Sequence, residues 1–274
     1  MPMTINTNVV SLNAQRNLST SQSSLATSMQ RLSSGLRVNS ARDDAAGLAI
    51  AERMGAQARG MSVAIRNATD AISLAQTAEG AIGKLSDMMQ RMRELAVQSA
   101  NATNGAGDRA NLNAEYQELA AEITRTIGAT RFNGLAILAG NAGAQAFQVG
   151  ANSGETVTVT TTNLSTNADV TAVTGGSVTS AALAGTAMTN IDTALNTLNS
   201  ERALYGATQN RFESIVSVLQ VAAENQMAAR GRIMDADFAA ETANLSRAQI
   251  LQQAGSAMVA QANQLPNQVL ALLR

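Results

Sequence analysis

The sequence contains no cysteine, no histidine and no tryptophan, and it has only four phenylalanines, two tyrosines and one lysine, Lys84. Without cysteine the chain can form neither a disulfide framework nor a thiolate site. Without histidine it lacks the commonest general base and the commonest zinc ligand, which removes most hydrolase and metalloenzyme mechanisms. We therefore expect a protein that is not an enzyme and that has no cofactor and no metal site.

Aromatic residues make up only 2% of the chain, although hydrophobic residues as a whole make up 45%. A compact globular core usually draws much of its buried area from phenylalanine, tyrosine and tryptophan. Here alanine, leucine, isoleucine and methionine supply the hydrophobic content, which is typical of long helices packed side by side. The composition predicts a mainly α fold.

Charge gives no sign of a nucleic-acid or membrane partner. The 19 basic and 20 acidic residues are interspersed along 274 residues, so no basic surface of the kind that binds nucleic acid is expected. No apolar run is long enough to span a membrane. The first ten residues, MPMTINTNVV, lack the basic and apolar regions of a cleaved signal peptide. If the chain is exported, we expect a route that needs no such signal.

Both ends of the chain carry apolar residues at the alternating four- and three-residue spacing of a coiled-coil seam. The N-terminal seam consists of Leu18, Leu25, Met29, Leu32 and Leu36. The C-terminal seam consists of Leu251, Met258, Leu265 and Leu272, with Gly255, Ala262 and Val269 between them. We predict that residues 1–42 and 235–274 pair as a terminal coiled coil. Chain ends usually fray unless something holds them in place, and the small residues Gly255 and Ala262 allow further helices to approach the pair closely. We therefore expect helices of neighbouring copies to complete this coiled coil.

The residues between these ends predict a long helical rod, residues 43–234. Apolar periodicity continues without proline from about residue 44 to 99, and again from about 181 to 230. A shorter helix is expected at 112–127. A β patch at about 131–162 includes an Asn133-Gly134 hairpin turn, and residues 163–180 predict a short variable surface loop. The simplest fold pairs the two halves antiparallel, with the β patch at the far tip.

Three clusters allow a metal-binding interpretation beside a structural one. Asp43-Asp44 and Asp235-Asp237 stand where helices are expected to begin, where acidic residues cap free N–H groups, and no further ligands lie at a workable spacing. Met88, Met89 and Met92 have the helical spacing of core residues. We favour capping for the acids and core packing for the methionines.

The chain resembles the bacterial flagellin family, the subunits of the flagellar filament. The resemblance rests on INTNVVSLNAQRNL from Ile5, RLSSGLRVNSARDDAAGLAIAERM from Arg31, QRMRELAVQSANATN from Gln90 and TRFNG from Thr130. It continues in FQVGANSGET from Phe147 and in the C-terminal segment from Arg232. It implies that the termini form a filament core and that the rod forms the wall around it. It also implies secretion through the flagellum, an extracellular location, and an export chaperone, a cap and hook-junction proteins as partners.

The resemblance implies two further surface functions. The stretch with Arg91, Leu95 and Glu115 resembles the surface of flagellins that the animal Toll-like flagellin receptor binds, although a salt-bridged rod face explains it equally simply. Hydroxyl residues in the β patch and the following loop resemble O-glycosylated segments of some flagellins. The alternative interpretation is that they are ordinary exposed residues of a strand and a loop. These residues are Thr158, Thr160, Thr162, Ser165 and Ser177.

The predicted function is therefore structural: a subunit that polymerises with itself into a filament that propels the cell. A hook–filament junction protein is one alternative, which the close C-terminal resemblance disfavours. A flagellin-like surface adhesin is another, but it would require a sizeable outer domain or an aromatic sugar-stacking patch. Neither is present in the sequence.

Overall fold

The computed structural model describes residues 7–141 and 143–271, with side chains described as far as residue 264. The chain divides into two compact units, one made of residues 1–56 and 225–274 and the other of residues 57–224. The long helices α2 (Ala45–Ala100) and α5 (Ala181–Met234) each contribute to both units. The predicted mainly α fold, with long antiparallel helices and a small β patch, is confirmed.

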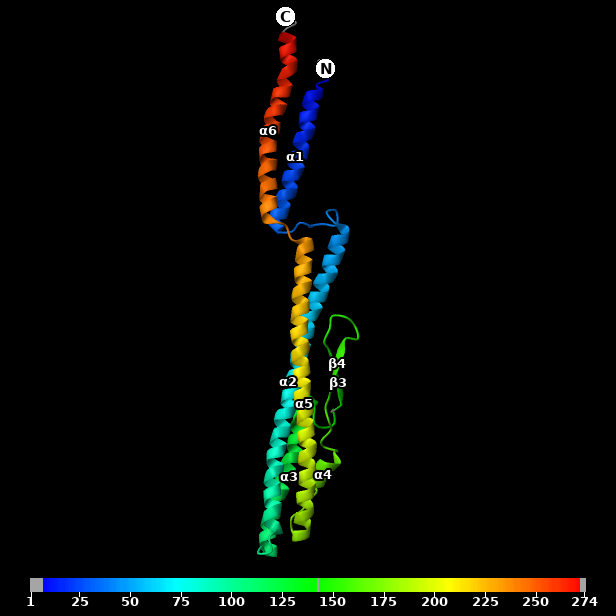
Figure 1. Ribbon diagram of the computed structural model, residues 1–274, viewed down its shortest axis with the longest axis vertical. Helices are drawn as coiled ribbons and strands as arrows, with labels where there is room; N and C mark the ends of the chain where they lie inside the picture. The colour runs from blue at the N-terminus through cyan, green and yellow to red at the C-terminus, as the bar shows by residue number, and fades with distance from the viewer. Residues whose placement is uncertain (1–6, 142, 272–274) are drawn as a thin grey trace. The chain divides into compact units, whose positions relative to one another are not determined.

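In the first unit, helix α1 (Val9–Ser34) packs antiparallel against helix α6 (Phe238–Ala271). The Asn8 side chain caps α1 by accepting a hydrogen bond from the Ser11 N–H at 3.0 Å, and its Nδ2 donates to the carbonyl of Ala262 at 2.7 Å. At the other end Gly35 closes α1 in the left-handed conformation, φ 71°, which favours glycine. Figure 1 shows the two helices side by side.

Acidic residues stand at the starts of α2 and α6, as the sequence predicts. The Asp44 carboxylate accepts the N–H of Gly47 at 2.7 Å, and Asp237 accepts the N–H groups of Ala239 and Ala240. Asp43 instead accepts the N–H of Ser40 at 2.9 Å and shapes the preceding turn. The N–H groups of the first helical turn have no carbonyl acceptor within the helix, and the carboxylates of Asp44 and Asp237 supply acceptors in their place.

In the second unit the core lies between α2, α3 (Ala106–Ala129) and α5. The antiparallel arrangement of α2 and α5 is visible in their polar contacts, because Arg93 pairs with Asp192 and Glu79 pairs with Gln209. Residues at seven-residue spacing are fully buried on both helices: Ile82, Met89 and Ala96 on α2, and Ile191, Leu198, Tyr205 and Phe212 on α5. Alanines and methionines alternate with larger residues here, so long helices pack closely with few aromatic side chains.

The β patch consists of two short antiparallel pairs. Strands β1 (Arg131–Phe132) and β2 (Leu135–Ala136) flank Asn133 and Gly134, which have φ values of 48° and 83°. This is the two-residue hairpin turn that the sequence predicts. Strands β3 (Ala144–Gln148) and β4 (Thr156–Thr160) pair over their whole length. The valines of β4 are buried and its threonines are exposed.

Two details of the sequence prediction are wrong. The β3–β4 hairpin does not lie at the tip where α2 ends, because Asn67 of α2 donates to the carbonyl of Gln148 at 2.9 Å. Helix α3 has 24 residues and at 1.5 Å per residue carries the chain back about 36 Å before the strands begin. Residues 163–180 are not a loop either, since they contain helix α4 (Ala168–Thr174), whose Val170 and Val173 are buried.

Candidate functional site

The α1–α6 interface consists mainly of small residues. The side chains that face the partner helix on α1 are Ser11, Ala14, Leu18, Ser21, Leu25 and Ser28, and on α6 they are Leu245, Ala248, Gln252, Gly255, Val259 and Ala262. A Cβ atom on Gly255 would lie 3.2 Å from Leu18 Cδ1. The helices therefore approach more closely at this point than a larger residue would permit.

The residues of the predicted polymerisation seam differ in their exposure within one copy. Leu18, Leu25, Leu32 and Leu36 are half-buried, whereas Met29 is 57% exposed. On α6, Leu251 is 50% exposed and Met258 is 60% exposed. The side chains of Leu265, Val269 and Leu272 lie outside the described residues.

The difference in exposure along α6 has a physical reason. The repeat in α6 contains two series at seven-residue spacing, one of large residues that begins at Leu251 and one of small residues that begins at Gly255. In the sequence, both series fit the seam of a coiled coil. In this structure the small series, with Gly255 and Ala262, faces α1. Small side chains let the backbones approach closely, and polar bonds such as that from Ser11 Oγ to Asn263 Oδ1 at 2.7 Å then reach across the pair. The large series of α6, with Leu251 and Met258, is left more exposed.

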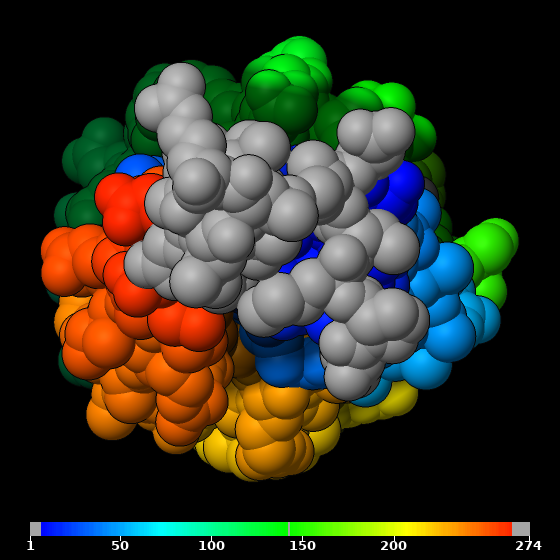
Figure 2. Space-filling model, turned by 90° about the horizontal axis from the view of Figure 1, so that it is seen from above, coloured from blue at the N-terminus to red at the C-terminus, as the bar shows by residue number. Residues whose placement is uncertain are grey.

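The outer surface of the α1–α6 pair is consequently rich in exposed large apolar side chains. They are Val9, Val10, Leu12, Met29, Phe238, Ile250, Leu251 and Met258, each between 50% and 65% exposed. A groove of about 570 Å³ runs between the two helices, with Leu251 and Met258 in one wall, Val9 and Val10 in the other, and Gly255 among the residues of its lining. Figure 2 shows the surface of α6, in orange, next to that of α1, in blue. An apolar surface of this kind marks an interaction site.

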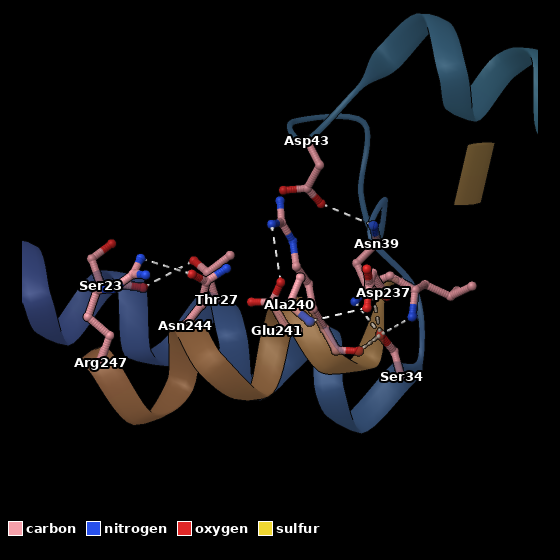
Figure 3. A network of polar contacts seen from close by, with 12 residues as sticks. Ser23, Thr27, Ser34, Asn39, Asp43, Asp237, Ala240, Glu241, Asn244 and Arg247 are labelled. Carbon is pink, nitrogen blue, oxygen red and sulfur yellow. Dashed lines mark hydrogen bonds and ion pairs between the residues drawn. The ribbon is translucent and has the colours of Figure 1, made fainter. Parts of the chain in front are cut away.

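The opposite end of the pair carries a polar cluster (Figure 3). Arg31 of α1 lies 3.9 Å from Glu241 of α6, which is only 8% exposed. The N–H groups of Ser40 and Asn39, then the Ser40 hydroxyl, and the positive charge of Arg31 hold the pKa of Asp43 below its usual value. The cluster fixes the ends of α1 and α6 together. Sequence reasoning missed it, because Arg31 and Glu241 are 210 positions apart and no spacing connects them.

The residues with a predicted receptor role divide into two groups. Arg91 lies on the surface of the second unit and forms ion pairs at 2.8 Å with both Glu94 and Glu115. Glu94 and Glu115 raise the pKa of the Arg91 guanidinium. Leu95 is only 1% exposed and belongs to the core. Its prediction as a surface contact is wrong, because it continues the buried face of α2 that Leu85 and Met92 define.

The predicted glycosylation positions also differ in exposure. Thr158, Thr160 and Ser165 are exposed, and each of the threonines lies on the outward face of β4. Thr162 is half-buried and donates to Glu201 at 2.8 Å. Ser177 is half-buried and donates to Asn113 at 2.9 Å. The last two hydroxyls are therefore already engaged in contacts within the fold.

The part of the chain that the structure describes, residues 7–141 and 143–271, shows neither a metal-binding cluster nor a membrane-spanning helix. Among those residues, no group of three or more acidic side chains is placed to hold a metal ion. No helix within the same ranges is long and apolar enough to cross a membrane. The apolar surface of the first unit is therefore the feature that requires a functional explanation.

Comparison with known proteins identifies two family regions. Residues 5–143 match the bacterial flagellin N-terminal helical region and residues 188–273 match the bacterial flagellin C-terminal helical region. The chain is 46% identical over 272 residues to a flagellin of Halalkalibacterium halodurans, covering 99% of this chain and all of that protein. It is 35% identical to flagellin A of Vibrio cholerae over an alignment of 379 residues that includes the whole of both chains. The crystal structure of Bacillus cereus flagellin matches with a TM-score of 0.51 and 35% identity, over 60% of this chain and 94% of that one.

Proposed function

The chain belongs to the bacterial flagellin family and is a structural subunit of the flagellar filament, and we propose that its copies polymerise through the outer surface of the α1–α6 pair. The observation that carries this proposal is the row of large apolar side chains that α1 and α6 leave exposed. In a single copy these side chains remain in contact with water. Burial against neighbouring copies removes them from it and supplies the driving force for assembly.

The distribution of charge supports the same surface. No charged residue occurs between Ala248 and Leu273, and Arg16 is the only one between Asn8 and Gln30. Charged side chains are rarely buried without a partner. Segments with serine, asparagine and glutamine but without charge can be surrounded by other copies, because each amide or hydroxyl can find a hydrogen-bond partner there.

Truncation tests the proposal directly. We expect the purified full chain to form filaments that sediment and are visible by electron microscopy, and a chain that ends at Arg247 to form none. The thermal unfolding of the second unit, followed by circular dichroism, serves as the control, because residues 57–224 are intact in both proteins. Filaments from the truncated chain would contradict the proposed role of α6.

The remaining expectations about location and partners follow from the family. Flagellins are filament subunits, so we place this chain outside the cell, in the filament. Export without a cleaved signal peptide, and recognition by an export chaperone, a cap and hook-junction proteins, stay predictions. The N-terminal sequence of the exported protein tests the first: it should begin within the first few printed residues rather than after a removed segment.

We further propose that the exposed ion-pair surface of Arg91, Glu94 and Glu115 is available to the animal Toll-like flagellin receptor. A planar guanidinium with two carboxylate neighbours offers directional hydrogen bonds at the surface. We expect Arg91→Ala to lower signalling in receptor reporter cells without lowering the melting temperature. Leu95→Ala should lower both, since Leu95 lies in the core. Unchanged signalling by the Arg91 variant would contradict this surface.

O-glycosylation is proposed at Thr158, Thr160 and Ser165, whose hydroxyls are exposed. Thr162 and Ser177 are poorer candidates because both residues are half-buried and their hydroxyls donate to other elements of the fold. The intact mass of the protein isolated from its native filament decides the matter. A mass equal to that of the printed sequence would contradict modification at every one of these positions.

A further inference from the structure

Three methionines have strongly exposed side chains among the residues that the structure describes: Met29 on α1, Met227 on α5 and Met258 on α6, at 57%, 51% and 60%. By contrast, Met89 and Met92 are completely buried in the second unit, and Met234 is 4% exposed. Two of the three exposed methionines thus lie on the helix pair that carries the proposed polymerisation surface. Met258 also lines the apolar groove between α1 and α6.

Exposed thioethers are chemically distinct from the leucines and valines around them. A hydroperoxide transfers one oxygen atom to the methionine sulfur: the peroxide O–O bond breaks, an S–O bond forms, the sulfur loses two electrons and, with hydrogen peroxide as oxidant, water is released. The product, methionine sulfoxide, is polar and chiral, and enzymes can reduce it back to methionine. The reaction requires access to the sulfur, so exposure in the free subunit decides which residues react.

We propose that Met258 and Met29 are oxidation-sensitive positions that control whether a free subunit can join the filament. This inference rests on the proposed role of the α1–α6 surface in polymerisation. In the free subunit both thioethers are open to a peroxide. In the filament the same side chains are covered by neighbouring copies and are protected from it.

The consequence for assembly follows from the polarity of the sulfoxide. Its strongly accepting oxygen has to leave water when the surface becomes buried. Most of the lining of the groove around Met258 is apolar, including Val9, Val10, Leu18 and Leu251, although Asn13, Asn17, Ser21 and Gln261 also lie in it. A buried acceptor without a partner is unfavourable. Oxidation of a free subunit therefore weakens its addition to the filament, while a finished filament stays intact.

The experiment compares subunits before and after treatment with hydrogen peroxide. Peptide mass spectrometry establishes when Met29 and Met258 carry one added oxygen, and sedimentation after seeding gives the critical concentration for polymerisation. We expect the critical concentration of the oxidised chain to rise about tenfold or more. Treatment with methionine sulfoxide reductases should restore it to within about twofold of the untreated value.

Matched variants identify the responsible sulfurs. The M29L/M258L double variant replaces both with a side chain of similar volume, so its critical concentration should change less than about twofold on peroxide treatment. Met227→Leu should remain as sensitive as the unaltered chain. If the double variant stays sensitive, or if a chain with both sulfoxides polymerises like the untreated one, the inference is wrong.

A second measurement needs no variant. Peroxide applied to assembled filaments should oxidise Met258 about tenfold more slowly than in free subunits, whereas Met258 reacting at the same rate in both would overturn the inference. The untreated chain separates the two proposals. If the untreated chain fails to polymerise, the proposed role of the α1–α6 surface is wrong. If it polymerises normally and the sulfoxides have no effect, only the inference about the methionines is wrong.

Discussion

Leu251→Gln is the most informative single change in the α1–α6 pair. Leucine and glutamine have similar helix propensities, and Leu251 lies in the wall of the α1–α6 groove with 50% of the residue exposed. The substitution therefore leaves the inward face of α6, with Gly255 and Ala262, unchanged. It alters the outer surface that we expect neighbouring copies to cover.

The size of the effect can be worked out from the exposure. Complete burial of a leucine is worth about 1.5–3 kcal/mol, so the exposed half of Leu251 contributes ~1 kcal/mol when a neighbour covers it. Burial of the new amide without full hydrogen bonding costs about 1–3 kcal/mol more. Their sum of ~2–4 kcal/mol corresponds to a rise of at least about 30-fold in critical concentration. In the free subunit, the substitution costs at most about 1 kcal/mol, because only the covered half of the side chain is affected.

Two assays separate these effects. Sedimentation of seeded polymer gives the critical concentration, and urea unfolding followed by circular dichroism gives the stability of the free subunit. Leu183→Gln on α5 is the matched control, since Leu183 is 45% exposed but lies in the second unit. The reasoning is refuted if Leu251→Gln polymerises within twofold of the unaltered chain, or if the control raises the critical concentration equally.

Three further predictions concern stability. Burial raises the pKa of both Tyr116 and Tyr205 from 10.0 to about 12, with the Glu201 charge adding to the effect at Tyr205. Because the pKa is higher in the folded state, the contribution of the neutral tyrosines to folding stability is complete below pH 10 and is lost between about pH 10 and 12. Tyr116→Phe should therefore reduce the fall of the urea midpoint over that pH range. Arg31→Met should lower the stability of the first unit by about 1–3 kcal/mol because it leaves Glu241 buried without its cation, and adding Glu241→Gln should recover part of the loss. Strictly additive effects of the two changes in this double-mutant cycle would show that the pair does not interact. Gly255→Val should reduce helix content and cost about 1–3 kcal/mol, since its methyl groups would overlap the neighbouring helix, and a stability equal to that of the unaltered chain would contradict the close approach.

The helices were the most predictable part of the fold. Apolar periodicity that continues over a 56-residue helix without proline leaves few alternatives to a long helix, and α2 ends within a residue of its predicted end. The Asn133-Gly134 turn was equally clear, because both residues tolerate the positive φ that the turn requires. Helix α4 was hidden by its threonine- and glycine-rich neighbours. Its signals were the Asn167 cap and the valines three residues apart, which become buried against the second unit.

For the candidate site, the sequence predicts the terminal helices but not the exposure of their individual residues. The seven-residue repeats identified the two terminal helices as an interaction surface, and the family resemblance pointed to filament formation. The repeats could not show which series each helix turns toward the other. Leu251 and Met258 fitted an internal seam as well as Gly255 and Ala262 did.

The sequence by itself determined that this chain is a helical protein with unusual apolar ends, because periodicity, the lack of aromatics and the absence of charge from residues 248–273 are local properties. Only the tertiary structure decided which side of each terminal helix is covered within one copy. That choice depends on how closely two backbones can approach, and thus on Gly255 meeting Leu18, which are 237 positions apart. Because Gly255 and Ala262 of α6 face inward, Leu251 and Met258 remain exposed, on the surface that we propose the next copy covers.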